Sequence, residues 1–291
     1  MPLPPFRFDG AHAVVTGAAS GIGEQLAHRL ADRGAHLLLV DVDAERLAAV
    51  ADHVARGRDV TVRTEVADLA DRDAVDALAA RVLGLWPRVD LLVNNAGVAV
   101  GGRFTDLTAA EFDRVIAVNF AAPVALCRGL LCGGALGRGA HVVNVSSVFG
   151  LLAPPGQSAY AASKFALRGF TEALRHELEP LGVGVTSVHP GGVRTRIAAS
   201  ARPATALDPR QAAEDLAAFE RLLTYPPERA ATRILDGVRR RRGRVLVAPS
   251  AVAGDLLVRL LPGRYWDVVR RLVPAAGRAT GRAPEAAGPE G

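Results

Sequence analysis

Lysine is almost absent from this chain. Lys164 is the only lysine in 291 residues, so the other 34 of the 35 lysine and arginine residues are arginine. Arginine keeps its charge at accessible pH, which accounts for a pI of about 10.0 although the formal net charge is only +5. Aromatic residues are also scarce, at 5%, and bases stack on aromatic side chains in many nucleic-acid sites. We therefore expect no nucleic-acid partner.

Cysteine and long apolar runs are scarce too. Cys127 and Cys132 have neither zinc-ligand nor CxxC spacing, and two cysteines do not make a disulfide framework. They are expected to be buried thiols in a reducing cytoplasm, and no metal site is expected. Residues 1–12 lack the basic segment and apolar run of a secretory signal, and no stretch of about 18 apolar residues predicts a membrane-spanning helix. We expect a cytoplasmic protein.

Short apolar runs alternate with helical patterns, which is typical of βαβ units around a parallel sheet. The predicted strands are residues 11–17, 35–41, 59–66, 88–97, 140–147, 183–192 and 243–249. The predicted helices are residues 21–33, 44–57, 71–84, 110–131 in two pieces, and 159–179. Because such crossovers are right-handed, we predict a doubly wound, Rossmann-type α/β fold. Its mostly parallel seven-stranded sheet lies between two helical layers in a single domain.

Composition divides the chain further. Residues 1–250 form the predicted Rossmann-type catalytic domain, and the proline-rich stretch 196–228 is a predicted substrate-loop insertion within it. Residues 251–275 are a predicted amphipathic helical extension, in which Pro262 and Gly263 separate two short helices. Residues 276–291 are small, polar and rich in proline and glycine, and we expect them to be disordered.

The extension carries arginines between its apolar residues, over residues 255–273. The arginines are Arg259, Arg264, Arg270 and Arg271. Such a segment can pack on the body of the protein or on a second subunit. A basic amphipathic segment with tryptophan can also make a peripheral contact with a membrane surface, and the sequence leaves these alternatives open.

The stretch TGAASGIG, residues 16–23, stands where the first strand turns into a helix. Gly17 permits the tight turn, Gly21 lets a pyrophosphate approach the backbone, and Gly23 allows the helix to pack closely on the strand. The helix N-terminus supplies unpaired N–H groups and a positive dipole end. The sequence thus predicts a dinucleotide-phosphate loop.

Asp41 ends the second predicted strand, 18 residues after Gly23. A carboxylate at this place accepts hydrogen bonds from the adenosine ribose, and it repels the 2′-phosphate of NADP. NAD is therefore the predicted cofactor, ahead of NADP. Arg46 on the next helix could reach such a phosphate, although a solvated position suits it equally well.

Tyr160 and Lys164 lie four residues apart on a predicted helix, and so on one face of it. A free tyrosine has a pKa near 10, and an adjacent ammonium favours the phenolate. The pair is therefore a candidate general acid/base, and it uses the only lysine of the chain.

Six motifs in this order resemble the short-chain dehydrogenase/reductase family. They are TGAASGIG (16–23), NNAG (94–97), VNF (118–120), NVSS (144–147), YAASK (160–164) and HPGGVRT (189–195), and the resemblance spans about residues 10–250. It implies that Tyr160 is the acid/base, that Lys164 lowers the tyrosine pKa and binds the nicotinamide ribose, and that Ser147 holds the substrate oxygen. Asn119 would support a water-linked proton relay, whereas Ser146 would be structural.

The resemblance also implies a set of cofactor residues. In the phosphate loop they are Gly17, Ser20, Ile22 and Gly23; at the adenosine side Asn94, Ala96 and Gly97; and at the nicotinamide Pro190, Gly191, Val193 and Thr195. Where the family usually has aspartate before an apolar residue, this chain has Glu65 and Val66, which would meet the adenine. Asp68 is a rival alignment.

These expectations define a function. The chain would transfer a hydride between NAD and a secondary alcohol or ketone, with oxidation the cellular direction. Phe149, Leu151, Leu152 and residues 98–100 predict an apolar or bulky substrate beside Ser147 and Tyr160. The resemblance implies a homodimer or homotetramer built partly on helices 123–136 and 159–179. The alternatives are an NADP-dependent carbonyl reductase and a nucleotide-binding regulatory protein.

Overall fold

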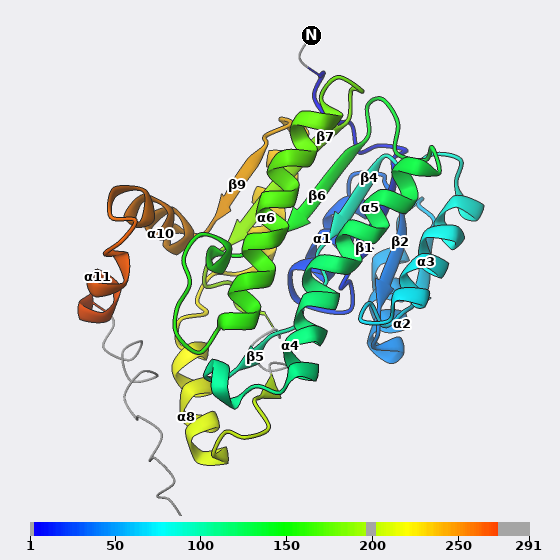
Figure 1. Ribbon diagram of the computed structural model, residues 1–291. Coiled ribbons are helices and arrows are strands. Elements are labelled where there is room, and N and C mark those ends of the chain that lie inside the picture. The colour runs from blue at the N-terminus through cyan, green and yellow to red at the C-terminus, as the bar shows by residue number, and fades with distance from the viewer. Residues whose placement is uncertain (1–2, 196–201, 273–291) are drawn as a thin grey trace, which may run out of the picture.

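One sheet of seven parallel strands runs through the middle of the molecule in this computed structural model, which describes residues 3–195 and 202–272 (Figure 1). The strand order is β3-β2-β1-β4-β6-β7-β9. The strands are β1 (His12–Thr16), β2 (His36–Asp41), β3 (Val62–Val66), β4 (Leu91–Asn94), β6 (His141–Val145), β7 (Gly184–Pro190) and β9 (Arg244–Val247). The order reverses between β1 and β4, which confirms the predicted doubly wound Rossmann-type sheet in a single domain.

Helices cover both faces of this sheet. One face carries α1 (Gly21–Ala31), α2 (Ala44–Ala55) and α9 (Pro227–Arg239), and the other carries α3 (Arg72–Leu85), α5 (Ala122–Cys132) and α6 (Ser158–Leu178). Successive strand residues point to opposite faces. Val14 and Leu38 therefore pack with α3 and α5, while the next residues, Val15 and Leu39, pack with α1 and α2.

The predicted helix over residues 110–131 is one continuous helical run with a wider turn inside it. It consists of α4 (Ala109–Ile116), the π-helical turn η2 (Ala117–Ala121) and α5, and Pro123 lies in the first turn of α5. Among the described residues this run, Ala109–Cys132, is the one helix that length and composition alone would allow to cross a membrane. Half of its apolar window is buried inside the protein, as in the core helix of a soluble protein. Cys127 is buried in it but Cys132 is exposed, which corrects the expectation of two buried thiols.

Several short strands and one-turn helices at the carboxyl ends of the strands were not predicted from the sequence. The short strands β5 (Val100–Gly101) and β8 (Arg202–Pro203) pair in parallel, so the segment after β4 is joined to the insertion. The insertion continues into α8 (Pro209–Glu220), which lies with β5 at the bottom of Figure 1. One-turn helices η1 (Phe104–Asp106) and η3 (Val148–Gly150) complete this edge.

The chain ends its described part in two short helices. They are α10 (Pro249–Leu260) and α11 (Tyr265–Leu272), and Pro262 and Gly263 lie between them as predicted. Both stand beside the sheet at one side of the molecule (Figure 1). The predicted disordered tail, 276–291, lies outside the described residues.

Candidate active site and nucleotide-binding loop

The loop between β1 and α1 has the backbone shape that its glycines permit. Gly17 has φ +66°, and a Cβ there would lie 2.7 Å from Cα of Ala96. A Cβ on Gly23 would overlap the carbonyl oxygen of Gly17, so only glycine lets α1 begin this close to the loop. Ile22 packs its side chain into the core, which leaves only its backbone to face a phosphate. Ser20 caps the start of α1 and is partly exposed.

Thr16 and Asn95 hold this loop against the end of β4. The Thr16 hydroxyl accepts hydrogen bonds from the backbone N–H groups of Asn95 (3.0 Å) and Ala96 (3.1 Å). The Asn95 amide donates in return to the carbonyls of Thr16 (3.0 Å) and Gly17 (3.1 Å). The sequence reasoning missed both residues, although Asn95 stands inside the NNAG motif.

Asn94, the first residue of that motif, directs its side chain into the interior, toward β6. Its side chain is buried and donates to Oδ1 of Asn144 (2.8 Å), with the thiol of Cys127 3.5 Å away. Asn144 donates in turn to the hydroxyl of Thr171 on α6 (3.0 Å). The predicted adenosine-side residue thus joins β4 to β6 in the interior, while Ala96 and Gly97 follow the strand end beside the phosphate loop.

Asp41 lies beside the phosphate loop at the end of β2. Its Oδ2 accepts a hydrogen bond from the backbone of Ala19 (2.9 Å), and its Oδ1 accepts from Val42 (2.8 Å) and Asp43 (3.2 Å). These contacts fix the direction of the carboxylate and leave further lone pairs for a ribose hydroxyl. The same loop borders a surface hollow of about 350 Å³ between α1 and α2, which Arg46 and other residues line. Arg46 itself pairs with Asp43 at 3.4 Å.

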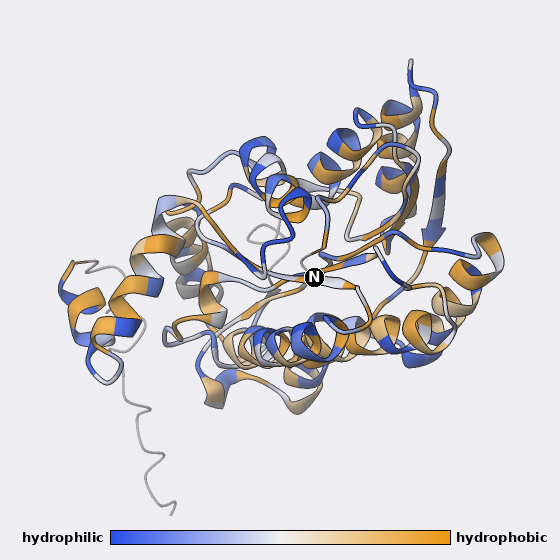
Figure 2. Cartoon of the chain, turned by 90° about the horizontal axis from the view of Figure 1, so that it is seen from above, coloured by the Kyte–Doolittle hydropathy of each residue, from blue (hydrophilic) through white to orange (hydrophobic). Residues whose placement is uncertain are grey.

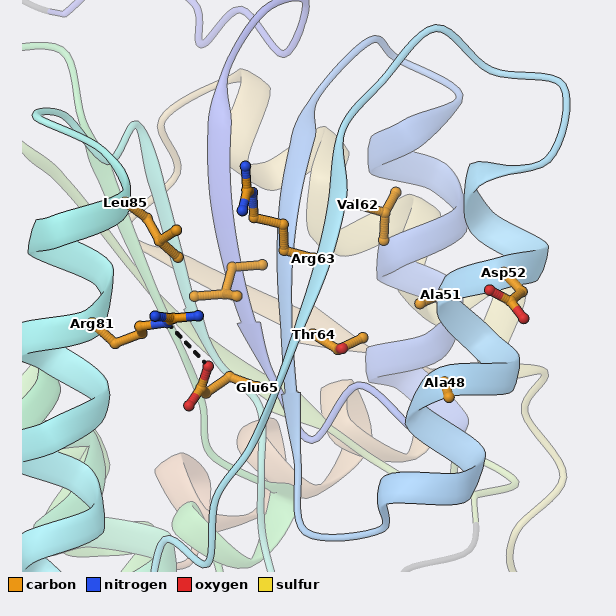
Figure 3. Close-up of a pocket in the computed structure, with 10 residues that line it drawn as sticks. Ala48, Ala51, Asp52, Val62, Arg63, Thr64, Glu65, Arg81 and Leu85 are labelled. Carbon is orange, nitrogen blue, oxygen red and sulfur yellow. Dashed lines mark ion pairs between the residues drawn. The ribbon is translucent and has the colours of Figure 1, made fainter.

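Glu65 faces α3. Its carboxylate lies 3.4 Å from the guanidinium of Arg81, and Figure 3 shows the two side chains pointing toward one another. They line a cavity of about 390 Å³ at the exposed edge of the sheet, around β3. Val66 ends β3 in register with Asp41, which puts it near the predicted adenine position. The rival residue, Asp68, forms an ion pair with Arg114, whose guanidinium donates three hydrogen bonds to its carboxylate.

The predicted catalytic residues come together where β6 ends. Ser147 caps the short helix η3, and its hydroxyl accepts a hydrogen bond from the backbone of Phe149 (3.0 Å). Tyr160 lies in the first turn of α6, close enough for the Ser147 side chain to act on the pKa of its phenol. Lys164 lies one turn further, with Nζ 5.6 Å from the centre of the Tyr160 ring. All three side chains are buried.

Lys164 and Asn119 are held by backbone groups. Nζ of Lys164 donates to the carbonyl oxygen of Val145 (3.0 Å), and the carbonyl of Lys164 accepts from Ser146, which has the structural place expected for it. Asn119 lies in the π-helical turn η2, and its amide exchanges hydrogen bonds with the backbone of Val98 (2.8 and 2.9 Å). Helical turns of this kind often mark functional sites.

The pKa values of the pair depart from the expectation. Burial raises the pKa of Tyr160 to about 12, against the opposing effect of its hydrogen bond with Ser147, and burial lowers the pKa of Lys164 to about 8. The sequence predicted that Lys164 lowers the pKa of Tyr160. In the protein alone, burial is the largest cause of both shifts, because each charged form loses its hydration.

The turn after β7 faces the phosphate loop. A Cβ on Gly21 would lie 3.1 Å from the side chain of Thr195, so the ends of β1 and β7 approach each other here. Val193 is buried in the core. The backbone N–H of Gly192 donates to the hydroxyl of Ser250 in α10 (3.1 Å), and a Cβ on Gly191 would overlap that hydroxyl. Sequence reasoning missed Ser250, which ties the predicted nicotinamide turn to the C-terminal extension.

Aromatic rings gather on the open side of Tyr160. The Phe149 ring lies 6.1 Å from the Tyr160 ring, edge to face, and 6.4 Å from the ring of Phe219 in α8. Phe219 was not predicted because the insertion gave no strand or motif to place it. Leu151 is buried, and Leu152 approaches Gly254 of α10.

The family model for short chain dehydrogenases matches residues 11–206 of this chain. The chain belongs to the short-chain dehydrogenase family. SadH of Mycobacterium tuberculosis, named as an oxidoreductase, is 41% identical over 266 residues, which cover 90% of this chain and 95% of SadH.

Solved structures of the short-chain dehydrogenase family superpose on the same fold. An enzyme from Burkholderia phymatum in complex with NAD has a TM-score of 0.78 at 32% identity, covering 88% of this chain and 95% of its own. One from Sphingobium yanoikuyae in complex with NADPH has a TM-score of 0.71 at 28% identity, covering 94% and 97%. This short-chain dehydrogenase therefore shares the nucleotide-binding Rossmann-type fold of these structures and is an oxidoreductase of that family.

A dinucleotide fits the loops of this short-chain dehydrogenase. Glycine at positions 17, 21 and 23 lets the loop backbone pack against Ala96, Thr195 and the Gly17 carbonyl, where a Cβ would collide, so no side chain stands on the loop at these positions. Phosphate oxygens can then approach the backbone N–H groups at the start of α1.

Proposed function

We propose that the chain oxidises an apolar or bulky secondary alcohol with NAD, and reduces the matching ketone in reverse, through Ser147, Tyr160 and Lys164. The observation that carries the proposal is the grouping of Ser147, Tyr160 and Lys164 in one buried site, where Nζ of Lys164 lies 5.6 Å from the centre of the Tyr160 ring and the Ser147 side chain acts on the pKa of Tyr160.

NAD supplies the hydride acceptor when it is bound. Tyr160 takes the hydroxyl proton of the alcohol, and Ser147 donates a hydrogen bond to the same oxygen. Lys164 stabilises the phenolate and binds the nicotinamide ribose, and Asn119 supports the proton relay beside it. Because burial holds the pKa of Tyr160 at about 12 in the protein alone, the mechanism needs positive charge nearby to bring it down.

Two observations support the cofactor and the substrate class. Asp41 holds a carboxylate beside the phosphate loop, where it favours NAD, and Val66 lies in register with Asp41 at the proposed adenine position. Phe149 and Phe219 offer aromatic surface above Tyr160, which favours apolar substrates. Arg46 in the neighbouring hollow favours the second candidate, an NADP-dependent carbonyl reductase.

Turnover of the purified chain tests this proposal. Aliphatic, cyclic and steroid alcohols are offered with NAD and with NADP, and the absorbance of the reduced ring is followed. We expect the highest kcat/KM with NAD and a bulky alcohol, and loss of turnover in Tyr160→Phe. A Tyr160→Phe variant as active as the unmodified chain contradicts the mechanism, and saturation by NADP alone supports the second candidate. Binding of NAD without any turnover supports a regulatory protein.

We also propose a cytoplasmic homodimer or homotetramer built partly on α5 and α6. α6 exposes the ring of Phe165, which a second subunit could cover, and neither cysteine forms a disulfide. Light scattering on the purified chain measures the particle mass, and a monomer at micromolar concentration contradicts the proposal.

A further inference from the structure

The two C-terminal helices adjoin the candidate active site. Ser250, at the start of α10, accepts the hydrogen bond from Gly192 after β7. Gly254, one turn later, packs on Val148 and Leu152 beside η3. The hydroxyl of Tyr265 in α11 accepts a hydrogen bond from the backbone of Ala153 (3.2 Å). The hairpin α10–α11 is thus fixed to the wall that carries Ser147 and Phe149.

The other side of α10 is apolar and faces outward. Val252, Leu256 and Leu260 follow one another at i, i+4 and i+8, and their exposed fractions are 46%, 56% and 68%. We call these three residues the outward row. In α11, whose eight residues are all described, no residue is buried and Leu272 is exposed. Figure 2 shows the hairpin at the left edge of the molecule, with hydrophobic and hydrophilic bands on both helices.

The hairpin is also basic. It carries four arginines and two aspartates, and both aspartates are engaged: Asp255 pairs with Arg244 and Arg259, and Asp267 pairs with Arg270. Arg264 and Arg271 are exposed and have no ion-pair partner within residues 3–195 and 202–272. An apolar row beside unpaired arginines complements a lipid surface, whose acyl region is apolar and whose anionic headgroups are negative.

We propose that the hairpin α10–α11 docks on an anionic lipid surface, with the outward row in the acyl boundary and the arginines at the headgroups. Trp266 suits this position, because amphipathic aromatic rings are enriched at membrane interfaces. A second copy of the chain is disfavoured as the occupant. A two-fold interface places the same patch on both sides, so it brings the arginines of one copy against those of the other.

This docking goes beyond the proposed function and is measured without turnover. The full chain is floated on a density gradient with vesicles of phosphatidylcholine alone or mixed with phosphatidylglycerol. We expect co-flotation with the mixed vesicles, and much less with neutral vesicles or at high salt. Leu256→Glu with Leu260→Glu should weaken vesicle binding at least about tenfold, since both side chains leave the acyl boundary. Arg264→Gln with Arg271→Gln should weaken it about 30-fold, at about fivefold per arginine.

Matched variants elsewhere on the molecule serve as controls. Leu181→Glu introduces the same charge at a leucine that is 59% exposed in the turn between α6 and β7. Arg56→Gln with Arg63→Gln removes two exposed arginines near β3, at the opposite edge of the sheet from β9. Thermal melting establishes that each variant folds, and the controls should float like the unmodified chain.

Two results overturn the proposal. One is that anionic vesicles do not float the chain, or float the control variants as poorly as the hairpin variants, so that the hairpin has no specific part in binding. The other is that Leu256→Glu with Leu260→Glu floats unchanged but has a smaller particle mass in sedimentation, which assigns the outward row to a second copy of the chain.

Discussion

Nδ1 of His189 lies 3.1 Å from the carbonyl oxygen of Ser147. A carbonyl only accepts hydrogen bonds, so Nδ1 carries the proton and Nε2 accepts from the hydroxyl of Ser187 (3.0 Å). Burial lowers the pKa of His189 to about 4, which keeps the ring neutral near pH 7. His189 therefore joins the end of β7 to the residue that presents the predicted substrate-binding hydroxyl.

His189 is a positioning residue by this geometry, and its replacement tests that role. His189→Leu should lower kcat about 10- to 100-fold, because a small displacement of a reacting group has an effect of this size. KM for NAD should stay nearly constant, since the phosphate loop does not depend on His189. Steady-state kinetics with saturating alcohol measures both quantities.

His189→Asn is the matched control. Its side-chain amide can donate to the Ser147 carbonyl in place of Nδ1, so it should recover most of the lost kcat. Equal losses in the asparagine and leucine variants would show that the histidine acts only through packing.

Replacement of Lys164 by arginine, the other long side chain with a positive charge, should impair turnover. The Lys164 side chain is 2% exposed, and Nζ reaches the Val145 carbonyl in a space fitted to an ammonium. Lys164→Arg keeps the charge but adds a larger planar group, so kcat should fall about 100-fold or more. Arg72→Lys, on the exposed surface of α3, is the control and should leave turnover unchanged. Retention of more than about a tenth of kcat in Lys164→Arg contradicts the assignment.

The same lysine should make stability depend on pH. Its pKa is lowered to about 8 in the folded protein from 10.5, so between these values the unfolded chain binds the extra proton. The free energy of unfolding should then rise with pH in this window, and the gain should be lost as pH falls through about 8.

Urea unfolding at several pH values between 8 and 10 measures this effect. The unmodified chain should gain about 2 kcal/mol more than Lys164→Met over the window. Tyr160 does not interfere, because its raised pKa changes stability only above its ordinary value of 10. Parallel pH dependence in the two proteins would mean that Lys164 keeps an ordinary pKa.

Much of this site could be predicted because it depends on the spacing of residues within single strands, helices and loops. Short apolar runs identified the seven strands, and a four-residue spacing put Tyr160 and Lys164 on one helix face. The glycines of residues 16–23 identified the phosphate loop, because a positive φ and close contacts with neighbouring backbone and side chains leave room only for glycine there.

The rest depends on contacts between distant segments. The β5–β8 ladder joins two-residue strands about a hundred positions apart, and strands this short leave no period in a sequence. Ser250 and His189 are single polar residues whose partners are known only once β7, α10 and η3 are in place. The rise in the pKa of Tyr160 could not be predicted because burial, unlike helical spacing, is a property of the whole fold.

Asp41 should set the choice of cofactor. Asp41→Asn keeps an oxygen that can accept from Ala19 but removes the charge that repels a 2′-phosphate. The ratio of kcat/KM for NADP to that for NAD should rise about 10- to 100-fold. Glu45→Gln is the control, because it removes one negative charge from the exposed first turn of the neighbouring helix α2. A similar rise in both variants would mean that general surface charge, and not Asp41, selects the cofactor.

Phe219 should set substrate size preference from the insertion. Phe219→Ala removes the ring that lies 6.4 Å from Phe149, and with it one apolar wall above Tyr160. Because a lost apolar contact of this size changes discrimination about tenfold or more, kcat/KM should fall by that factor for bulky alcohols and little for short ones. Phe104→Ala, at an exposed phenylalanine of η1, is the control and should leave both values unchanged. If Phe219→Ala lowers kcat/KM equally for short and bulky alcohols, the ring orders the insertion instead of binding substrate.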